Sequence, residues 1–372
     1  MGIAVVGGSL AGLFTATLLA QDGHDVTVYE RSLHGLGGRG AGFLGKRETF
    51  AILRASGCEH VARVGVISRE RIVFGDAGTP LVQPMPPQMQ ISWDAVYRVF
   101  RERKADGTYL PGKKVEHLRE DTNRVVLRFE DGNEAMADLV IGADGIASVV
   151  RAVVDGPSAS NSYAGYVGWR GLLSESALPG FAREELLDRF AYFRMPYSHI
   201  IGFLVPGAGG ETGTGRRRYN WVWYRPAAGP ATRDGVLTDS QGRIHRYSLP
   251  PGTVSERARE RLVDDARRLL PRSFAAAVEE TARPFEQGIF DYETEWMVSQ
   301  RIALVGDAAF VVRPHTGMGI AKAAADAIAL PKHMSSVPLE TALRNYAQER
   351  IQAGKAVAAS GRELGARLMS PS

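Results

Sequence analysis

Apolar runs and glycine-rich turns alternate at the start of the chain, and this alternation constrains the fold more than any other feature. Residues 3–6 are aliphatic, residues 10–20 have the length and composition of a helix, and residues 26–29 form a second β-branched run. The sequence Gly-Gly-Ser at 7–9 separates the first run from the helix. A strand, a helix and a second strand in so short a space form the unit of a parallel sheet. We therefore expect an α/β fold.

The first turn occupies the frame of a G-x-G-x-x-G dinucleotide-binding turn. Gly7 lets the chain turn tightly, a small Ser9 lets the backbone approach a pyrophosphate, and Gly12 allows the helix to pack closely on the strand. The helix start at Leu10 and Ala11 offers free N–H groups and a partial positive charge to phosphates. Ser9 replaces the usual middle glycine and weakens the match. The alternative is a glycine-rich turn in an unrelated α/β protein.

An acidic residue follows the second strand at the position that a dinucleotide site requires. Glu30 lies 18 residues after Gly12, where its carboxylate would accept hydrogen bonds from ribose hydroxyls. A carboxylate there disfavours a 2′-phosphate, so FAD or NAD fits this site and NADP does not. Arg31 follows directly and is a further cofactor-binding candidate.

Two later apolar runs also end in short motifs with an aspartate. Residues 139–141 lead into Gly-Ala-Asp-Gly, which contains Asp144 and is followed by Arg151. Residues 302–305 lead into Gly-Asp-Ala-Ala, which contains Asp307. Strands that are apolar on both faces are typical of sheets covered by helices. An alternative function for Asp307 is that of a helix N-cap.

Together, the three segments closely resemble the signatures of the class A flavoprotein monooxygenases, the para-hydroxybenzoate hydroxylase type, and the resemblance covers nearly the whole chain. It implies FAD as cofactor and NADPH or NADH as co-substrate. It also implies that O2 adds to the reduced flavin to give a C4a-hydroperoxide, which hydroxylates an electron-rich aromatic ring. In such an enzyme the cofactor carries the difficult chemistry, and the protein orients the substrate and excludes water.

The resemblance implies residue roles as well. Asp144 and Arg151 belong to a segment that serves both FAD and the nicotinamide nucleotide, and Asp307 bonds the ribityl chain. The loop against the flavin ring contains Pro314, Gly317, Met318 and Gly319.

The chain departs from the family at several of these positions. Phe310 stands where a histidine is usual, and Ala321, followed by Lys322, stands where an asparagine is usual. Trp93 replaces a common arginine, which leaves Arg98 as the nearest candidate to bind the pyrophosphate.

Within the family, three stretches resemble the members that hydroxylate 2,6-dihydroxypyridine. These are residues 5–9, residues 163–171, and Arg313-Pro314-His315 together with residues 321–323. The resemblance implies a hydroxylated ring, including a heteroaromatic one, as the substrate.

His315 is the candidate catalytic residue and also a candidate to bind the substrate, because a histidine can hold or deprotonate a ring hydroxyl. The alternative is a loop histidine bonded to the backbone. His199 and His245 lack a motif, and we interpret them as structural or exposed. Further substrate-binding candidates are aromatic residues of the insertion, which could equally be core: Tyr192, Trp221 and Trp223.

The segments between the sheet-forming motifs predict a second, inserted domain. Aromatic-rich strands are expected at 71–74, 190–194, 200–205 and 219–225, and helices at 255–270 and 339–368. The predicted fold is a Rossmann-like FAD-binding domain with an inserted, largely antiparallel β-sheet substrate domain and a C-terminal helix. We assign 1–68, 90–162 and 282–372 to the FAD-binding domain, and 69–89 and 163–281 to the substrate-binding domain.

Composition excludes several other classes of protein. The net charge is only +4, and the densest basic cluster, Arg216 to Arg218, is interpreted as a solvated loop, so nucleic-acid binding is not expected. No uninterrupted run reaches the ~18 apolar residues of a membrane span. Cys58 is the single cysteine, which excludes a disulfide within the chain and fits a cytoplasmic protein. A homodimer is left open, and no metal-binding pattern such as HExxH occurs.

Other functions remain open at this point. One is a flavin reductase, oxidase or epoxidase on the same scaffold. A second is an NAD-dependent dehydrogenase, which is disfavoured because its nucleotide domain would be continuous in sequence. A third is a non-catalytic protein that binds a flavin or a small aromatic compound.

Overall fold

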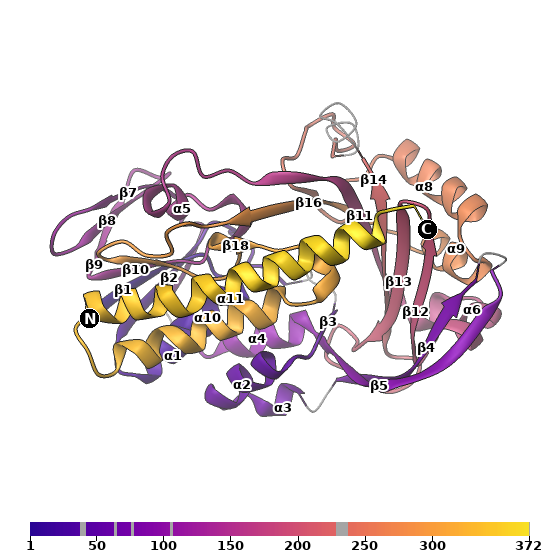
Figure 1. Ribbon diagram of the computed structural model, residues 1–372, viewed down its shortest axis with the longest axis horizontal. Helices are drawn as coiled ribbons and strands as arrows, with labels where there is room; N and C mark the ends of the chain where they lie inside the picture. The colour runs from indigo at the N-terminus through magenta and orange to yellow at the C-terminus, as the bar shows by residue number, and fades with distance from the viewer. Residues whose placement is uncertain (38–41, 63–64, 76–77, 105–106, 228–236, 372) are drawn as a thin grey trace.

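A five-stranded parallel sheet forms one end of the computed structural model, which describes residues 1–37, 42–62, 65–75, 78–104, 107–227 and 237–371 (Figure 1). Its order is β17-β10-β1-β2-β6. The strands are β1 (Gly2–Val6), β2 (Asp25–Glu30), β6 (Tyr109–Pro111), β10 (Leu139–Gly142) and β17 (Ile302–Leu304). The predicted β-α-β unit and the two later strands are therefore confirmed, and they lie side by side.

Helices pack against this sheet and against one another. Helix α1 contacts α10 and α4, and α10 also contacts α2 and α11. The helices of this part are α1 (Leu10–Gln21), α2 (Arg47–Ala55), α3 (Glu59–Ala62), α4 (Trp93–Glu102), α5 (Val150–Val154), α10 (Gly319–Met334) and α11 (Leu339–Leu368). Helix α11 has the predicted bounds and runs along the molecule toward the second sheet (Figure 1).

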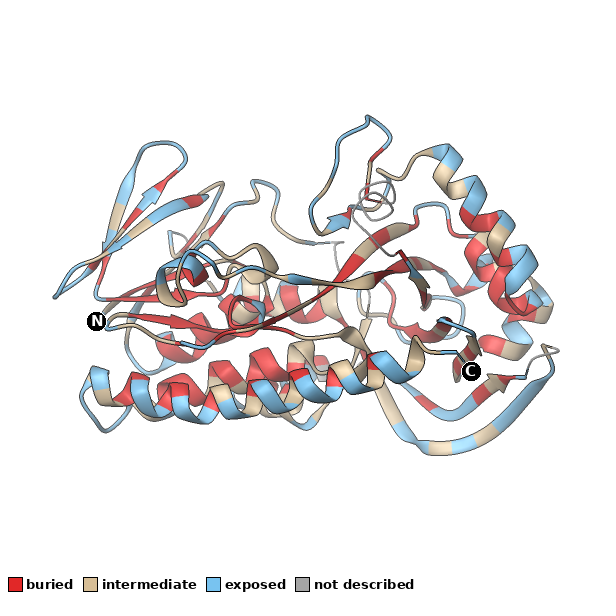
Figure 2. Cartoon of the chain, turned by 45° about the horizontal axis from the view of Figure 1, so that its top comes forward, coloured by how far each residue is buried: buried red, intermediate tan, exposed pale blue. Residues whose placement is uncertain are grey.

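Helix α11 is long because its inward face stays buried over its whole length. Its buried residues recur every three or four positions, which places them on one side of the helix (Figure 2). Glycines on that side allow close approach: a Cβ at Gly354 would lie 2.5 Å from the Phe310 ring, and one at Gly365 would lie 2.9 Å from the Arg313 side chain. The helix thus fixes the segment that carries residues 310–313.

A ten-stranded, mostly antiparallel sheet forms the other part of the molecule. Its order is β15-β16-β11-β14-β13-β12-β4-β5-β3, and β18 pairs with β16. The strands are β3 (Gly42–Leu44), β4 (Val66–Phe74), β5 (Pro80–Ser92), β11 (Ser162–Ser174), β12 (Arg189–Met195), β13 (Ser198–Val205), β14 (Arg218–Pro226), β15 (Ser248–Leu249), β16 (Phe285–Glu293) and β18 (Phe310–Val311). The predicted antiparallel insertion is confirmed.

Smaller elements complete the described chain. A three-stranded sheet contains β7 (Val115–Glu120), β8 (Val125–Phe129) and β9 (Glu134–Ala137). Short 3-10 turns are η1 (Gly145–Ala147), η2 (Glu175–Ala177), η3 (Gly306–Ala308) and η4 (Pro314–Thr316). Within the described ranges, no helix has the length and apolar character needed to cross a bilayer.

The ten-stranded sheet has two faces with different surroundings. Helices α6 (Gly180–Leu186), α8 (Glu256–Leu269) and α9 (Arg272–Glu279) cover one side, which we call the helix-covered face (Figure 1). The opposite side, called the inner face, is turned toward η4 and α11, because Tyr166 and Tyr224 on it contact His315. Side chains alternate between the faces along each strand.

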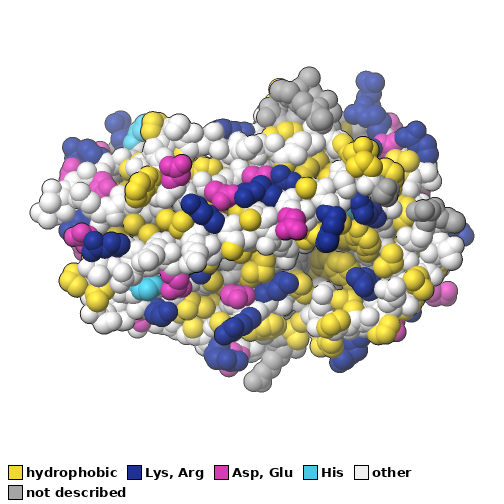
Figure 3. Space-filling model, in the orientation of Figure 1, with side chains coloured by type: hydrophobic (Ala, Val, Ile, Leu, Met, Phe, Trp, Pro, Cys, Tyr) yellow, Lys and Arg dark blue, Asp and Glu magenta, His cyan; other side chains and the backbone are white. Residues whose placement is uncertain are grey.

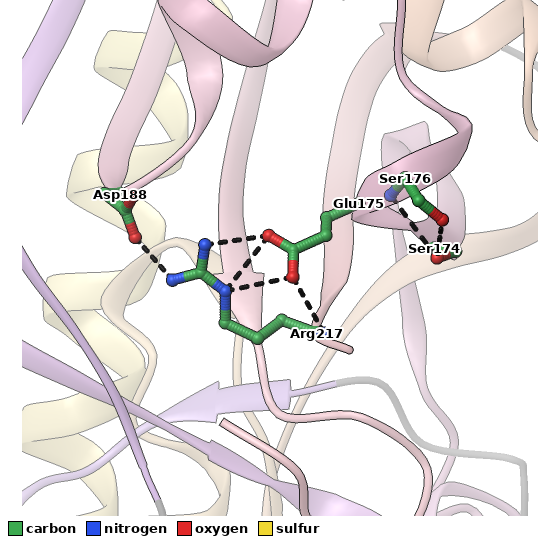
Figure 4. Close-up of polar contacts among 5 residues, drawn as sticks. All are labelled: Ser174, Glu175, Ser176, Asp188 and Arg217. Atoms are coloured by element: carbon green, nitrogen blue, oxygen red, sulfur yellow. Dashed lines mark hydrogen bonds and ion pairs between the residues drawn. The ribbon is translucent and has the colours of Figure 1, made fainter. Parts of the chain in front are cut away.

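Arg217 corrects the interpretation of residues 216–218 as a solvated loop. Its guanidinium is buried and bonds the buried carboxylate of Glu175, with Nη2 to Oε2 at 2.7 Å, and also bonds Asp188 (Figure 4). This network ties the start of β14 to η2 and to the residue before β12, where Asp188 has a φ of +62°. A local charge count missed it because the partners lie far away in sequence.

Candidate flavin and substrate site

The turns after β1, β10 and β17 meet at one edge of the parallel sheet. Val6 pairs with Gly142, and Gly142 pairs with Leu304, so these three strands end at the same level. The backbones come so close there that a Cβ at Gly7 would lie 2.4 Å from the carbonyl oxygen of Ala143. A Cβ at Gly12 would lie 1.9 Å from the carbonyl oxygen of Gly7. Both glycines are therefore required by packing, as the sequence predicts.

The N-terminus of α1 is open to an anion. The Ser9 side chain makes no capping hydrogen bond, and the first turn has no acidic residue. The first helical hydrogen bond runs from the N–H of Leu13 to the carbonyl of Ser9, so the N–H groups of residues 10–12 have no acceptor within the helix. These donors and the positive end of the helix suit a pyrophosphate.

A cavity of about 280 Å³ adjoins this helix start and the end of β2. Gly7, Ser9, Glu30, Arg31 and Asp144 are among the residues that line it. The buried Glu30 accepts hydrogen bonds of 2.8 Å from the N–H groups of Gly8 and Ser32, which fixes its carboxylate beside the cavity.

Asp144 organises the second segment. Its carboxylate accepts hydrogen bonds from the Ser148 hydroxyl at 2.5 Å and from the N–H groups of Val149 at 2.7 Å and Val150 at 3.3 Å. Burial raises the pKa of Asp144, and these hydrogen bonds oppose that rise. The carboxylate therefore holds the chain at the start of α5 while the residue lines the cavity.

Arg151 does not offer its side chain to a ligand, which corrects its prediction as a direct cofactor contact. It is 2% exposed, and its guanidinium donates to the carbonyls of Ala308 at 2.8 Å and Asp307 at 2.6 Å. It also lies 3.8 Å from the centre of the Tyr292 ring. Arg151 thus joins the second segment to the third.

Asp307 has the properties expected of a ligand-binding carboxylate. It lies within η3 and does not cap a helix, so the N-cap alternative is wrong. Its side chain is exposed, and it makes no hydrogen bond with the described residues. The surrounding protein atoms shield its carboxylate from part of the solvent and so raise its pKa, while the positive charges of Lys322 and Arg151 oppose the rise. A carboxylate left free in this way can accept strong hydrogen bonds from hydroxyls.

Lys322 is a buried cation beside Asp307. Its Nζ lies 3.8 Å from the Asp326 carboxylate and has no hydrogen-bond partner among the described residues. Asp326 in turn accepts from the N–H of Gly306 at 2.9 Å and from Arg350 Nε at 2.8 Å. The positive charge of Lys322 thus balances two carboxylates. One is Asp326, which bonds the N–H of Gly306, and the other is Asp307, which lies just after β17.

The loop before α10 presents its backbone to the same region. Pro314 begins η4, Gly317 has a φ of +64°, and α10 starts at Gly319 after Met318. The first turn of α10 has no side-chain cap and no acidic residue, so its N–H groups can meet the carbonyl edge of a flavin. With the pyrophosphate donors, the fixed Glu30 and the free Asp307, this donor set fits FAD.

His315 lies at the junction of this loop and the inner face. Its Nε2 is 2.7 Å from the Tyr166 hydroxyl, so it is bonded to a side chain and not to the backbone. Its ring centre lies 4.6 Å from that of Tyr224 and 5.2 Å from that of His199. We call these four residues, Tyr166, His199, Tyr224 and His315, the His–Tyr cluster.

Both histidines of the cluster are neutral at pH 7. Burial lowers the pKa of His315 to about 4 and that of His199 to about 3. The Nδ1 atoms of both rings are buried and have no partner among the described residues. Each ring therefore has at least one nitrogen whose hydrogen-bonding capacity the described residues leave unused.

His199 was missed as a site residue, because no motif surrounds it. The only signal was its position: it pairs with Tyr224 across β13 and β14, so both side chains lie on one face. Tyr192 also lies near this cluster, with its ring centre 6.2 Å from that of His199.

Trp221 and Trp223 lie on the helix-covered face, which corrects their prediction as substrate contacts. Both are 0% exposed. The Nε1–H of Trp221 donates to the Thr281 hydroxyl at 2.9 Å, and that of Trp223 donates to Ser198 at 3.0 Å. They belong to the core under α8 and α9.

The departures from the family have clear structural consequences. Phe310 is buried against Gly354 of α11, so this position supports the helix. Ala321 is buried in the first turns of α10. Arg98 is exposed on α4, and Trp93 stacks on Tyr97 with ring centres 5.0 Å apart.

Figure 3 shows a hollow right of the centre, below the C-terminal part of α11 and beside β13, with hydrophobic side chains in its depth. It lies on the side of the sheet that carries the His–Tyr cluster. The geometry therefore provides a dinucleotide cradle at one end and, next to the loop before α10, an inner sheet face that carries the hydrogen-bonding groups of the cluster.

Comparison with known proteins defines the class. Residues 5–47 match the family described as NAD(P)-binding Rossmann-like domain, and residues 163–291 match the family described as FAD binding domain-like. The chain is 33% identical to 2,6-dihydroxypyridine 3-monooxygenase of Paenarthrobacter nicotinovorans, over 98% of this chain and 91% of that protein. It is 28% identical to 3-amino-4-hydroxybenzoate 2-monooxygenase of Streptomyces cremeus, over 94% of this chain and 83% of that protein.

The fold agrees with these relatives. The structure of 2,6-dihydroxypyridine-3-hydroxylase from Arthrobacter nicotinovorans superposes with a TM-score of 0.92 at 31% identity, covering 100% of this chain and 93% of the other. The chain belongs to the FAD-dependent aromatic-ring monooxygenases. It is an enzyme of that type, with FAD as cofactor and with O2, a reduced nicotinamide nucleotide and an aromatic compound as substrates. The predicted family, fold class and cofactor are confirmed.

Proposed function

We propose that this enzyme hydroxylates a single hydroxylated aromatic ring of the dihydroxypyridine type. The observation that carries the proposal is the His–Tyr cluster, in which two neutral imidazoles with unpaired Nδ1 atoms adjoin the loop at 314–319. Hydroxyl and ring-nitrogen groups of a small heteroaromatic compound match such hydrogen-bonding partners. The relative of 33% identity, which is named for a dihydroxypyridine, supports the same substrate class.

The cofactor contacts follow from the free donors and acceptors. We assign the N–H groups at Leu10, Ala11 and Gly12, beside Gly7 and Ser9, to the pyrophosphate. Glu30 and Arg31 are assigned to the adenosine end of FAD, and Asp144 is assigned to the same cavity, which it lines. Arg98 is proposed as a cation that binds the pyrophosphate in addition to these N–H groups.

Asp307 is assigned to the ribityl hydroxyls, and Pro314, Gly317, Met318 and Gly319 to the flavin ring. Bound FAD, once reduced by NADPH or NADH, supplies the oxygen-activating chemistry. The protein's part is to bind the ring, orient the reacting carbon and exclude water.

His315 is the residue that we place against the substrate. A pKa of about 4 makes its imidazole a weak base, so its main contribution is a hydrogen bond that orients the ring. Tyr166 fixes the position of the imidazole through the bond to Nε2. Tyr192 lies at the edge of the same surface and is proposed to contact the ring.

We also propose the division of the chain into an FAD-binding part, 1–68, 90–162 and 282–372, and a substrate-binding part, 69–89 and 163–281. The ten-stranded sheet takes strands from both, since β16 lies within the first part and β11 lies mainly within the second. A cytoplasmic location is supported by Cys58, which is a buried free thiol. A homodimer without nucleic-acid or membrane partners completes the proposal.

A screen on the FAD-loaded enzyme tests the function. Dihydroxypyridines, simple phenols and larger polyketide-like aromatics are added in turn with NADH or NADPH, and nucleotide oxidation is followed together with the product mass under ¹⁸O2. We expect a dihydroxypyridine to stimulate nucleotide oxidation and to gain one ¹⁸O atom. Oxidation without stimulation would indicate a reductase or oxidase, an epoxide product an epoxidase, and binding without turnover a carrier or sensor.

A further inference from the structure

Arg170 is an arginine without a partner on the inner face of the sheet. It is half-buried on β11, its Nε is buried without a hydrogen-bond acceptor, and no ion pair to it occurs among the described residues. Buried guanidinium N–H groups normally bond carboxylates or carbonyls, because a buried donor without an acceptor is costly, and the Nε–H of Arg170 has none among the described residues. This exception requires an explanation.

The register of β11 places Arg170 beside the His–Tyr cluster. Arg170 pairs with Val222, two residues before Tyr224, and it lies on the face of β11 that carries Tyr166. Its positive charge acts on the Tyr224 hydroxyl, where it opposes the rise in pKa that burial causes. The guanidinium therefore lies on the inner face, close to the His–Tyr cluster.

Two other arginines near the cluster show how Arg170 differs. Arg313 forms a two-pronged bond with Asp291, with Nη2 to Oδ2 at 2.7 Å, so its charge is neutralised. Arg194 donates from Nη2 to the carbonyl of Arg367 at 2.8 Å, which anchors the end of α11. Arg170 alone among these three has neither kind of partner in the described chain. Its charge is available to a ligand.

We propose that Arg170 binds a negatively charged oxygen of the aromatic substrate, so that the enzyme selects rings that arrive as oxyanions. This inference rests on the proposed function and names the charge state of its substrate. The oxygen can belong to a ring oxyanion or to a carboxylate, since a guanidinium pairs with either. The neutral nitrogens of His199 and His315 then complete the binding of an anion without competing for the cation.

The chemistry of the cluster agrees with this assignment. Burial lowers the pKa of His315 to about 4, so the imidazole is too weak a base to remove the proton of an ordinary phenol, whose pKa is about 10. A ring that is already ionised needs no such base. It is also electron-rich, as an attacking aromatic carbon must be.

Equilibrium binding to the oxidised FAD-loaded enzyme, without NAD(P)H, tests the proposal independently of turnover. The probes are benzoate against benzamide for a carboxylate, and 2,4-dinitrophenolate against 2,4-dinitroanisole for a ring oxyanion. Each pair differs in charge but little in shape. We expect the parent enzyme to bind the anion of at least one pair about ten-fold more tightly, as measured by isothermal titration calorimetry.

Variants assign that preference to Arg170. R170M should reduce the preference to less than about two-fold, and R170K should keep part of it, because lysine retains the charge without the fork of donors. R225M is the matched control: Arg225 lies on the neighbouring strand β14 and pairs with Asp265, which keeps a second partner in Arg268. This control should keep the full preference.

Two results would overturn the proposal. One is equal binding of anion and neutral probe by the parent in both pairs. The other is an R170M variant that is folded, as judged by its bound FAD, and still prefers the anion. Failure of the hydroxylation screen with a retained anion preference would contradict the proposed function and leave Arg170 as an oxyanion-binding residue.

Discussion

The two faces of the ten-stranded sheet use the same strands for opposite purposes. On the helix-covered face, Trp221 and Trp223 are buried with their indole N–H groups bonded. On the inner face, His199, His315 and Arg170 contain buried nitrogens without partners, and they lie together. The helix-covered face thus contributes mainly to the stability of the fold, whereas the inner face carries polar groups that a ligand can bond.

Unpaired polar atoms alone do not mark a site, and the helix-covered face shows this. Glu286 is 0% exposed there, opposite Trp169, and neither carboxylate oxygen has a hydrogen-bond partner among the described residues. Its one charged neighbour in the described part of the chain is Arg225, which is paired with Asp265, whereas the inner-face groups adjoin a loop that fits a flavin. Clustering next to a cofactor loop is what distinguishes a binding site from an isolated buried acid.

The largest effect on activity should come from the inner face. We expect His315→Ala to lower kcat by roughly 100-fold or more, because a hydrogen bond that orients the substrate is lost, while the melting temperature changes little. Steady-state kinetics with the substrate identified in the screen measures this, with the melting temperature of the FAD-loaded variant as its control. A large loss of stability with unchanged kcat would reverse the comparison of the two faces.

Glu286, on the helix-covered face, should make the free energy of unfolding of the protein depend on pH. Burial raises its pKa from 4.5 to about 9, so the unfolded chain loses its proton first as the pH rises. Its contribution to the free energy of unfolding is complete below pH 4.5 and is lost between pH 4.5 and 9. Glu286→Gln should therefore stabilise the protein by on the order of 5 kcal/mol at pH 8 and by little at pH 5. Thermal unfolding of both proteins across this range checks the difference.

The histidines of the inner face should make the free energy of unfolding change with pH in the opposite direction. Their pKa values fall from 6.5 to about 4 for His315 and about 3 for His199, so the unfolded chain binds more protons at acid pH. The free energy of unfolding should rise with pH from about 3 to 6.5. His199→Gln should flatten this rise by up to about 1.4 kcal/mol per pH unit. An unchanged acid slope in the variant would mean that His199 stays charged in the folded protein.

Trp221→Phe should weaken the fold and spare the chemistry. The change removes the indole N–H bonds to Thr281 and Ala277 and leaves a small cavity, at a cost of about 1–3 kcal/mol in the free energy of unfolding. Urea unfolding measures this loss, and kcat of the folded FAD-loaded variant should remain within about two-fold of the parent, because the side chain faces away from the cluster. A collapse of kcat at full stability would place Trp221 in the substrate site after all.

The smallest expected effect is that of Tyr166→Phe. The variant loses the 2.7 Å bond to His315 Nε2 and the weaker contact of the hydroxyl with Arg313, so kcat should fall by roughly five- to ten-fold, in line with about 1 kcal/mol for one hydrogen bond. Tyr163→Phe is the matched control. Tyr163 lies on the same strand as Tyr166, and its hydroxyl donates a hydrogen bond to the carbonyl of Ala227, away from His315. An equal effect of the two variants would show that strand β11 as a whole, and not the imidazole contact, is disturbed.

The sequence by itself determined the local features of this protein. The strand and helix at the start, the glycines at 7 and 12, and the bounds of α11 follow from hydrophobic periodicity and turn chemistry within a few tens of residues. The three aspartate and glycine motifs sufficed to indicate FAD and the monooxygenase family.

Only the tertiary structure decided which side chains meet. The sequence predicted an aromatic-rich strand at 219–225, but not that Trp221 faces the helices and Tyr224 faces His315. The sequence predicted a solvated Arg217 and a cofactor-binding Arg151, whereas the fold pairs Arg217 with Glu175 and Arg151 with the carbonyls of residues 307–308. His199 joined the site through strand pairing alone. Such contacts depend on sheet register and on the sides that helices take, which are properties of the whole fold and not of any local stretch of sequence.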